Sequence, residues 1–234
     1  MNIIVTGASR GIGAETVKIL AKHKGNNIVA ISRNAEGLRK LNLECSKLNN
    51  DTKLMTVEFD LAQIEFYPFL LQKVETFFKH CDVLVLNAGR LINKPFEKME
   101  SQDFDDIFNI NVKSPFFLVQ QFVSMMSKGS HIIMISSMGG IQGSKKFKGL
   151  SLYSASKGAI AILTESLAEE LLEKEISVNC LAPGSTQTEM FEKAFPGMKA
   201  LQSPLQMAQF VADFAVTGQR FFNGKIIPVS LSVP

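Results

Sequence analysis

The chain has 234 residues, of which 46% are hydrophobic and 20% are charged, and its formal net charge is +3. It is long enough for one large α/β domain or two small ones, while the small charge and scattered basic residues give no reason to expect a nucleic acid or a membrane as a partner. The three cysteines, Cys45, Cys81 and Cys180, lie far apart without a Cys-x-x-Cys pair, so we expect no disulfide framework, no metal site and a reducing, cytoplasmic location.

Short apolar runs alternate with longer helical segments along the chain. The apolar run at 2–6 predicts a strand rather than a signal peptide, and no apolar run is long enough to span a bilayer. Further strands are expected at 28–31, 54–59, 83–86, 131–135, 176–181 and 225–229. Helices are expected at 12–24, 35–48, 64–79, 103–126, 153–173 and 203–216, with Pro115 bending the fourth helix or starting a new section.

Strands that are apolar on both faces belong to a buried parallel sheet with helices packed on each side. We therefore predict a single doubly wound α/β domain over residues 1–234, with about seven parallel strands and helices on both faces.

A glycine-rich loop, TGASRGIG at residues 6–13, joins the first strand to the first helix. Glycines allow the backbone to turn sharply and to approach a phosphate, which the free N–H groups of a helix start can bind. The spacing is G-x-x-x-G-x-G rather than the G-x-G-x-x-G of the general dinucleotide fingerprint, so a plain glycine-rich turn is an alternative interpretation.

The same loop also matches G-x-S-x-G, the nucleophile elbow of α/β-hydrolases, at residues 7–11. That elbow should follow a central strand and needs an acid and a histidine downstream. None of His23, His80 and His131 is a convincing base, and we interpret all three as side chains that are hydrogen-bonded within the protein or exposed to water.

The second strand ends at Ser32 and Arg33 without an acidic residue. An acid at this position would bind the ribose 2′-hydroxyl of NAD, whereas an arginine suits the 2′-phosphate of NADP. Arg33 and Arg10 are both available, so NADP(H) is predicted over NAD(H), unless both arginines are ordinary surface residues.

Tyr153 and Lys157 stand four residues apart at the start of an expected helix and so share a helix face. A tyrosine pKa near 10 is too high for efficient proton transfer at neutral pH, and a nearby ammonium lowers it. The pair is thus a sensible acid–base unit, although the isolated pattern is common by chance.

Polar residues follow neighbouring strands at the edge where functional groups gather in a parallel sheet. Ser136 and Ser137 follow the fifth strand, and the Asn87-Ala88-Gly89 segment follows the fourth. Asn111 lies inside the long expected helix, where a buried amide is unfavourable unless it has hydrogen-bonding partners.

With these motifs in order, the chain resembles the short-chain dehydrogenase/reductase family over nearly its whole length. The resemblance is carried by the TGxxxGxG loop, Asn87-Ala88-Gly89, the Asn111 segment, Ser137 with Tyr153-x-x-x-Lys157, and Pro183-Gly184 followed by Thr188-Glu189-Met190. It implies a Rossmann-type domain that binds a nicotinamide cofactor.

The resemblance also implies the roles of the catalytic residues. Tyr153 exchanges a proton with the substrate oxygen, while Lys157 lowers the tyrosine pKa and holds the nicotinamide ribose. Ser137 orients the substrate oxygen, and Asn111 supports a water that connects Lys157 with solvent. The implied cofactor-binding residues are Gly7, Ser9, Arg10, Gly11, Ile12, Gly13, Ser32, Arg33, Asp60, Leu61, Asn87, Ala88, Gly89, Tyr153, Lys157, Pro183, Gly184, Thr186 and Thr188.

Three segments depart from the family pattern. The interval from Ser137 to Tyr153 is about three residues longer than the family pattern. The extra residues make the basic loop at 144–151 unusual, and Ser136 could take the catalytic role in place of Ser137. A short substrate lid is expected at about 189–202, where Met190, Phe191, Phe195 and Met198 either line an apolar pocket or simply pack. The C-terminal segment 227–231 lacks the family's usual turn.

We therefore predict an NADP(H)-dependent oxidoreductase acting on a small carbonyl or alcohol substrate, with a 3-oxoacyl thioester as one candidate. The alternative is a catalytically inactive NADP(H)-sensing protein of the same fold. The family analogy predicts a homodimer or homotetramer, with the 103–126 and 153–173 helices at the interface.

Overall fold

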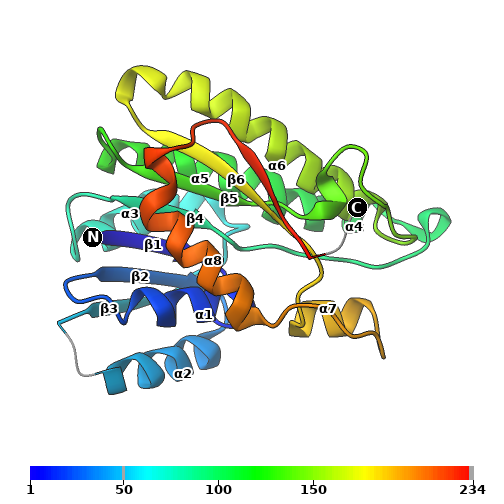
Figure 1. The fold of residues 1–234 in the computed structure, drawn as a ribbon, viewed down its shortest axis with the longest axis horizontal. Coiled ribbons are helices and arrows are strands. Elements are labelled where there is room, and N and C mark those ends of the chain that lie inside the picture. The colour runs from blue at the N-terminus through cyan, green and yellow to red at the C-terminus, as the bar shows by residue number, and fades with distance from the viewer. Residues whose placement is uncertain (49–50, 232–234) are drawn as a thin grey trace.

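The computed structural model describes residues 1–48 and 51–231 (Figure 1). In this part of the chain, seven parallel strands form one sheet in the order β3-β2-β1-β4-β5-β6-β7. The strands are β1 (Asn2–Thr6), β2 (Asn27–Ser32), β3 (Lys53–Glu58), β4 (Val83–Leu86), β5 (His131–Ile135), β6 (Ser177–Pro183) and β7 (Ile226–Val229). The predicted doubly wound parallel sheet is confirmed.

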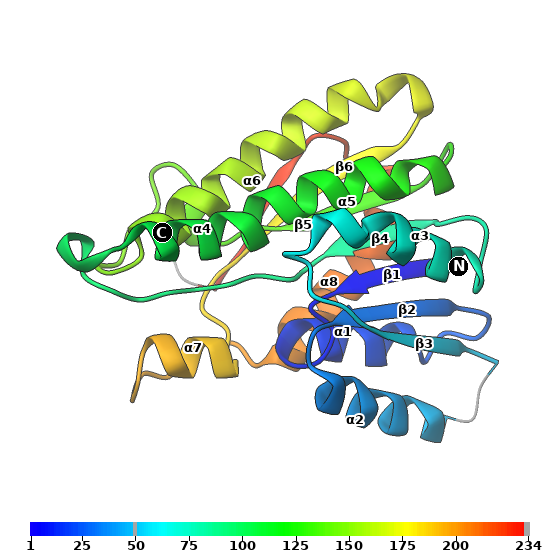
Figure 2. The ribbon, with the colours of Figure 1, turned by 180° about the vertical axis from the view of Figure 1, so that it is seen from behind.

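Helices cover both faces of the sheet, which explains why its central strands are apolar throughout. One face packs against α3 (Tyr67–Glu75), α5 (Ser114–Phe122) and α6 (Ser151–Glu170). The other packs against α1 (Gly11–Leu20), α2 (Ala35–Cys45) and α8 (Pro204–Thr217). Figure 2 shows these two helical layers on opposite sides of the strands.

The helical segment predicted at 103–126 is divided into two α-helices. The first part, α4 (Ser101–Phe108), gives way to a π-helical segment at Asn109–Lys113 before α5 begins. Pro115 lies in the first turn of α5, where its missing N–H is tolerated, so the proline does start a new section. The π-helical segment lies upstream of it and contains Asn111.

Other helix ends differ from the predictions by a few residues. α1 ends at Leu20 rather than Lys24, and α6 ends at Glu170 rather than Glu173. α3 begins only at Tyr67, because a 3₁₀ turn precedes it. α8 begins where predicted, after a capping box in which the Ser203 hydroxyl accepts from the Gln206 backbone and the Gln206 side chain accepts from Ser203.

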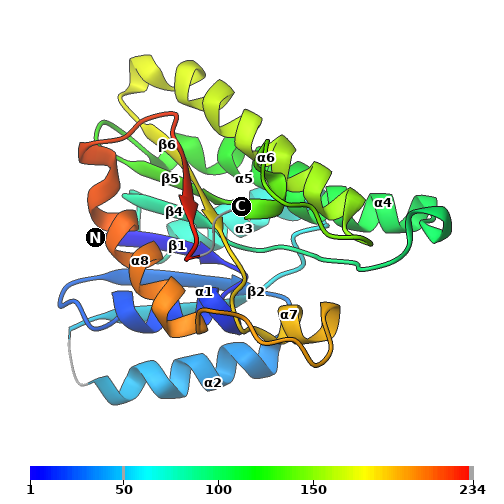
Figure 3. The ribbon, with the colours of Figure 1, turned by 45° about the vertical axis from the view of Figure 1, so that its right-hand side comes forward.

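The strand order reverses between β1 and β4, which are neighbours in the sheet although β2 and β3 separate them in sequence. Parallel sheets of this type bind ligands beyond the carboxyl ends of the strands at such a reversal. Figure 3 shows α7 (Glu189–Ala194) and the start of α6 at this end of the sheet. Among the described residues, none of the helices combines the length and the apolar character needed to cross a membrane.

Candidate active site

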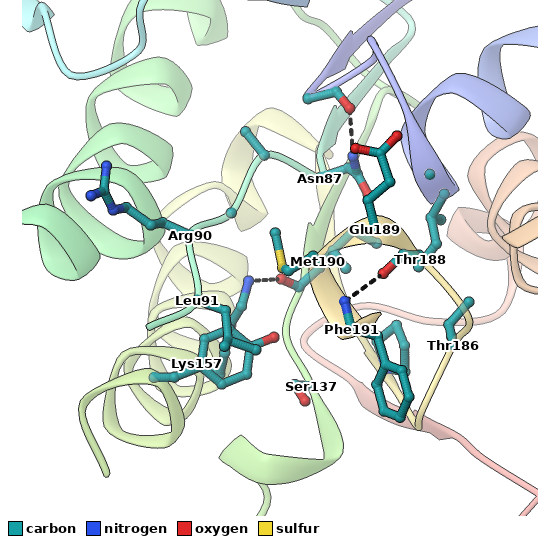
Figure 4. A pocket seen from close by; sticks show the side chains of 18 of the residues that line it. Asn87, Arg90, Leu91, Ser137, Lys157, Thr186, Thr188, Glu189, Met190 and Phe191 are labelled. Atoms are coloured by element: carbon teal, nitrogen blue, oxygen red, sulfur yellow. Dashed lines mark hydrogen bonds between the residues drawn. The ribbon is translucent and has the colours of Figure 1, made fainter. Parts of the chain in front are cut away.

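A cavity of about 840 Å³ lies at this end of the sheet and is walled by the segments that follow β1 to β6. All of the site residues predicted above line it except Gly13 and Asn111. The sheet therefore brings together the glycine loop, the serines after β5 and the Tyr153–Lys157 pair. Figure 4 shows part of this cavity, with Lys157 on the left, Ser137 below the centre, and Thr188 and Phe191 around the start of α7 on the right.

The glycine loop is shaped by the chain after β4. The Asn87 amide donates from Nδ2 to the carbonyl oxygens of Thr6, at 3.0 Å, and Gly7, at 3.3 Å. Gly7 has φ +66°, and a Cβ there would lie 2.8 Å from the Ala88 Cα, so only glycine fits. Gly13 lies outside the cavity because it packs directly against Gly7 and Asn87. The loop thus presents backbone at the start of α1, which suits a pyrophosphate.

The end of β2 forms the far end of the cavity. The Ser32 hydroxyl donates to Ser9 Oγ at 2.8 Å, and Asn34 caps α2 by accepting from the Gly37 backbone at 2.9 Å. Arg33 lines the cavity and is exposed. Arg10 also lines it, but its guanidinium is paired with Glu189 at 2.7 Å, a contact that the sequence did not indicate.

Tyr153 and Lys157 lie on one face of α6, as predicted, and both line the cavity. Lys157 is only 4% exposed, and its ammonium donates to the Ile135 carbonyl at 2.8 Å. Burial lowers the pKa of Lys157 to about 8, since an ammonium is poorly solvated there. The Nζ atom lies 5.8 Å from the centroid of the Tyr153 ring.

The pKa of Tyr153 is raised rather than lowered in this structure. Burial is the main cause, and a hydrogen bond with Ser137 acts in the opposite direction. Lys157 is expected to lower this pKa, but its ammonium donates to the Ile135 carbonyl and does not offset the effect of burial. Tyr153 is therefore a neutral phenol here, the form that can donate a proton.

The two adjacent serines have different environments. Ser136 is 3% exposed, and its hydroxyl donates to the Lys157 carbonyl at 2.7 Å, which holds α6 against the end of β5. The Ser137 hydroxyl lies in the cavity, where it hydrogen-bonds with Tyr153 and accepts the backbone N–H of Gly139 at 3.2 Å. Ser137 is the serine placed to reach a substrate.

Asn111 is 1% exposed and does not line the cavity, yet its amide is fully engaged. Its Oδ1 accepts from the Arg90 N–H at 2.7 Å, and its Nδ2 donates to the Arg90 carbonyl and to Ser156 Oγ, both at 2.9 Å. The side chain therefore fixes the segment after Gly89 against α6, one residue before Lys157. Arg90 itself pairs with Asp106 at 2.6 Å and points away from Lys157 (Figure 4).

The remaining predicted residues come from β3 and β6. Asp60 accepts from the Ala62 backbone at 3.0 Å, next to Leu61. Thr188 begins α7 by accepting from the Phe191 N–H at 3.2 Å, and Thr186 bridges to Gln202 at the base of the lid. Pro183 and Gly184 connect this base to the sheet.

Sequence reasoning missed several residues that line the same cavity. They are Asn34, Phe59, Arg90, Leu91, Ile92, Ile110, Ile135, Met138, Gly139, Phe147, Leu150, Ser185, Glu189 and Lys199. Met190, Phe191, Phe195 and Met198 also line it, so the interpretation of these side chains as pocket wall holds. Asn34, Phe59 and Arg90 follow strands closely, whereas Ile110, Phe147 and Leu150 lie far from any strand end and carry no motif that could have indicated them.

No histidine or cysteine among the described residues lines this cavity. His131 is fully buried, with Nδ1 3.1 Å from the Ala215 carbonyl and Nε2 3.0 Å from Asn179 Nδ2. All three cysteines are free thiols. No group of three His, Cys, Asp or Glu side chains that could hold a metal ion occurs within 1–48 and 51–231.

Comparison with known proteins adds independent information. The family described as short chain dehydrogenase matches residues 1–199. Hydroxynaphthalene reductase-like protein Arp2 of Metarhizium acridum (strain CQMa 102) is 28% identical over 96% of this chain and 91% of its own. A short-chain dehydrogenase/reductase of Pestalotiopsis microspora is 32% identical over 97% and 92%. The crystal structure of a short chain dehydrogenase from Burkholderia cenocepacia J2315 in complex with NADP has a TM-score of 0.86 and 26% identity over 97% and 95% of the two chains.

Proposed function

The chain belongs to the short-chain dehydrogenase family of oxidoreductases, and from that premise we propose that it transfers a hydride between NADP(H) and a ketone or its alcohol. The observation that carries this proposal is the cavity that joins the glycine loop to Tyr153, Lys157 and Ser137. A phosphate cradle and a proton donor in one cavity are the two parts that nicotinamide-dependent carbonyl chemistry requires.

The nucleotide fits the residues present, since glycine backbone without side chains lies at the start of α1. Gly11, Ile12 and Ser9 would hold the pyrophosphate, while Asp60 and Leu61 would contact the adenine. Asn87 to Gly89 would line the ribose, and the segment from Pro183 to Thr188 would face the nicotinamide. The bound cofactor supplies or accepts the hydride.

The side chains of α6 and β5 handle the proton and the substrate oxygen. Ser137 donates a hydrogen bond to that oxygen and orients it toward Tyr153. During reduction the neutral Tyr153 phenol donates its proton to the oxygen and becomes a phenolate, and during oxidation the phenolate accepts the proton of the alcohol. Lys157 holds the ribose hydroxyls of the nucleotide through its ammonium.

Two observations favour NADP(H) over NAD(H). The segment after β2 offers Arg33 and no carboxylate, and Arg10 stands at the glycine loop on the same cavity. A planar guanidinium suits a phosphate, whereas an acidic side chain would repel it. The solved structure from Burkholderia cenocepacia was determined in complex with NADP.

The substrate half of the cavity is mainly apolar. Its walls are formed by Leu91, Ile92, Leu150, Met190 and Phe191, so we infer a ketone on an apolar body. A 3-oxoacyl thioester and a ring ketone both meet this description. The name of the Metarhizium acridum relative refers to a ring compound, a hydroxynaphthalene.

The decisive experiment compares the wild type with Tyr153→Phe. Purified protein should oxidise NADPH with a panel of acetoacetyl thioesters and cyclic ketones, and Tyr153→Phe should lower kcat by at least about 100-fold while NADPH still binds. Arg33→Asp should weaken NADPH binding but not NADH binding. Tight NADPH binding without turnover of any ketone would contradict the enzyme and favour the cofactor-sensing alternative.

We also infer a homodimer or a larger homo-oligomer. Phe104 on α4, Phe116 on α5 and Ile162 on α6 are exposed apolar side chains, and Figure 2 shows these three helices side by side. Burying such a surface against a second copy removes apolar area from water. Sedimentation velocity of the wild type and of Ile162→Lys tests this, since a monomeric wild type contradicts it.

A further inference from the structure

The basic loop at 144–151, which leads into α6, and the residues just before it are held in place by side chains of the loop. The Ser144 hydroxyl donates to the carbonyl oxygens of Met138 and Ile141. The Lys146 ammonium donates to the carbonyl oxygens of Ile141, at 2.6 Å, and Ser144, at 3.0 Å. These bonds satisfy the loop's own backbone and fix its shape independently of a ligand.

This loop places one aromatic ring against the lid. The ring of Phe147 meets that of Phe195 edge-on, with centroids 5.8 Å apart at 62°. Phe195 in turn lies against Phe191, with centroids 5.2 Å apart. All three rings line the cavity, and Phe195 and Phe191 belong to the lid. Two segments more than 40 residues apart in the sequence thus share one aromatic wall.

A third segment, after β4, contacts both the lid and the basic loop. Asn93 donates from Nδ2 to the Ala194 carbonyl at 2.6 Å, at the end of α7. The next residue, Lys94, donates its backbone N–H to the Gly149 carbonyl at 3.1 Å. Gly149 has φ +82°, and a Cβ there would overlap the Asn93 side chain. The lid and the basic loop are therefore tied to each other directly and through Asn93 and Lys94.

We propose that Phe147 and Phe195 together form the end wall of the substrate pocket and set the size of the ketone that the enzyme accepts. The accepted class is a compact apolar ring ketone, and the excluded class carries a bulky group on the side of the ring remote from the carbonyl. Flat rings suit walls of Phe and Met because offset and edge-on aromatic contacts add to apolar burial. This inference rests on the proposed function, because it concerns the substrate of that same reaction.

The test uses β-tetralone, a compact bicyclic ketone, and its 6-phenyl derivative, with NADPH as reductant. The wild type should reduce β-tetralone with the higher kcat/KM. Phe147→Ala and Phe195→Ala should each raise the 6-phenyl to unsubstituted ratio of kcat/KM by about 10-fold, since removing a ring opens space for one. Because the two rings form one wall, the double variant should gain less than the product of the single effects.

Three controls separate a wall from a general packing role. Phe147→Tyr keeps the ring and should keep the wild-type ratio. Phe221→Ala removes a ring that is 78% exposed and does not line the cavity, and should also leave the ratio unchanged. The dissociation constant of NADPH should stay within about twofold in every variant, because Phe147 and Phe195 do not belong to the glycine loop.

The outcomes distinguish this proposal from the proposed function. Turnover of both ketones with an unchanged ratio in Phe147→Ala and Phe195→Ala overturns the end wall and leaves the enzyme intact. Absence of turnover counts against the proposed function. The size preference is then measured as calorimetric dissociation constants of the two ketones for the NADP⁺-loaded protein, and an unchanged preference there overturns the end wall as well.

Discussion

The Arg10 guanidinium donates from Nη1 to the Glu189 carboxylate at 2.7 Å, which joins the glycine loop to the first residue of α7. Both side chains are about half exposed, so the pair contributes at most about 1 kcal/mol. A guanidinium that binds this carboxylate offers fewer donors to a phosphate. If the chain binds NADP(H) as proposed, Glu189 would compete with the 2′-phosphate for Arg10.

Removal of this competition should tighten NADPH binding. We expect Glu189→Gln to lower the dissociation constant of NADPH by about two- to fivefold, the range that about 1 kcal/mol allows, and to leave that of NADH unchanged. Glu192→Gln is the matched control on the same helix, because Glu192 accepts from Gln187 instead. Equal shifts for NADPH and NADH, measured by fluorescence titration, would show that Arg10 does not contact the 2′-phosphate.

The ammonium of Lys157 should titrate within the working range of the protein. Its pKa is lowered to about 8 by burial, so the charged form is lost above pH 8 rather than above its usual value near 10.5. If the ribose hydroxyls are held by the charged form, the dissociation constant of NADPH should rise by up to about tenfold from pH 7 to pH 9. Lys157→Arg keeps the charge and should flatten this profile, whereas a profile equal to that of the wild type would contradict the role of Lys157.

The fold could be predicted because its strands are apolar on both faces, as the runs at 83–86 and 131–135 illustrate. Those two strands have the predicted bounds, β4 and β5. The π-helical segment at Asn109–Lys113 could not be predicted, since its apolar periodicity is that of an ordinary helix. Within this segment, Asn111 hydrogen-bonds with Arg90 and Ser156, and only the tertiary structure creates these contacts.

The candidate site was predictable where a motif carries it and not where distant segments meet. The glycine loop and the Tyr153–Lys157 pair are contiguous patterns, so their place at the sheet edge follows from topology. The wall formed by Phe147 and Phe195, and the pairing of Arg10 with Glu189, join segments that the sequence keeps apart. The raised pKa of Tyr153 could not be predicted, because it comes from burial of the phenol, which depends on the tertiary structure.

Asn111 should matter to stability and to the position of Lys157. Asn111→Asp keeps the size but loses both Nδ2 donors, which leaves the Arg90 carbonyl and Ser156 Oγ without these bonds in a buried place. We expect a loss of about 2–4 kcal/mol in the free energy of unfolding and a fall in kcat. Asn109→Asp, in the same π-helical segment but only partly buried, is the control. Equal urea midpoints for the two variants would show that the Asn111 amide contributes no more to the free energy of unfolding than the Asn109 amide.

His131 should make the protein sensitive to acid. Burial lowers its pKa to about 4 from 6.5, although a hydrogen bond with the Ala215 carbonyl opposes the shift. The unfolded state therefore binds a proton between pH 6.5 and 4 that the folded state does not, so stability is complete above pH 6.5 and falls as the pH drops to 4. The shift corresponds to about 3 kcal/mol of unfolding free energy.

Urea unfolding at pH 7 and pH 4.5 should show this loss in the wild type and in His23→Asn, whose site is exposed. His131→Asn should be less stable at pH 7 but should lose less on acidification, and a parallel loss in all three proteins would assign the acid sensitivity to other groups.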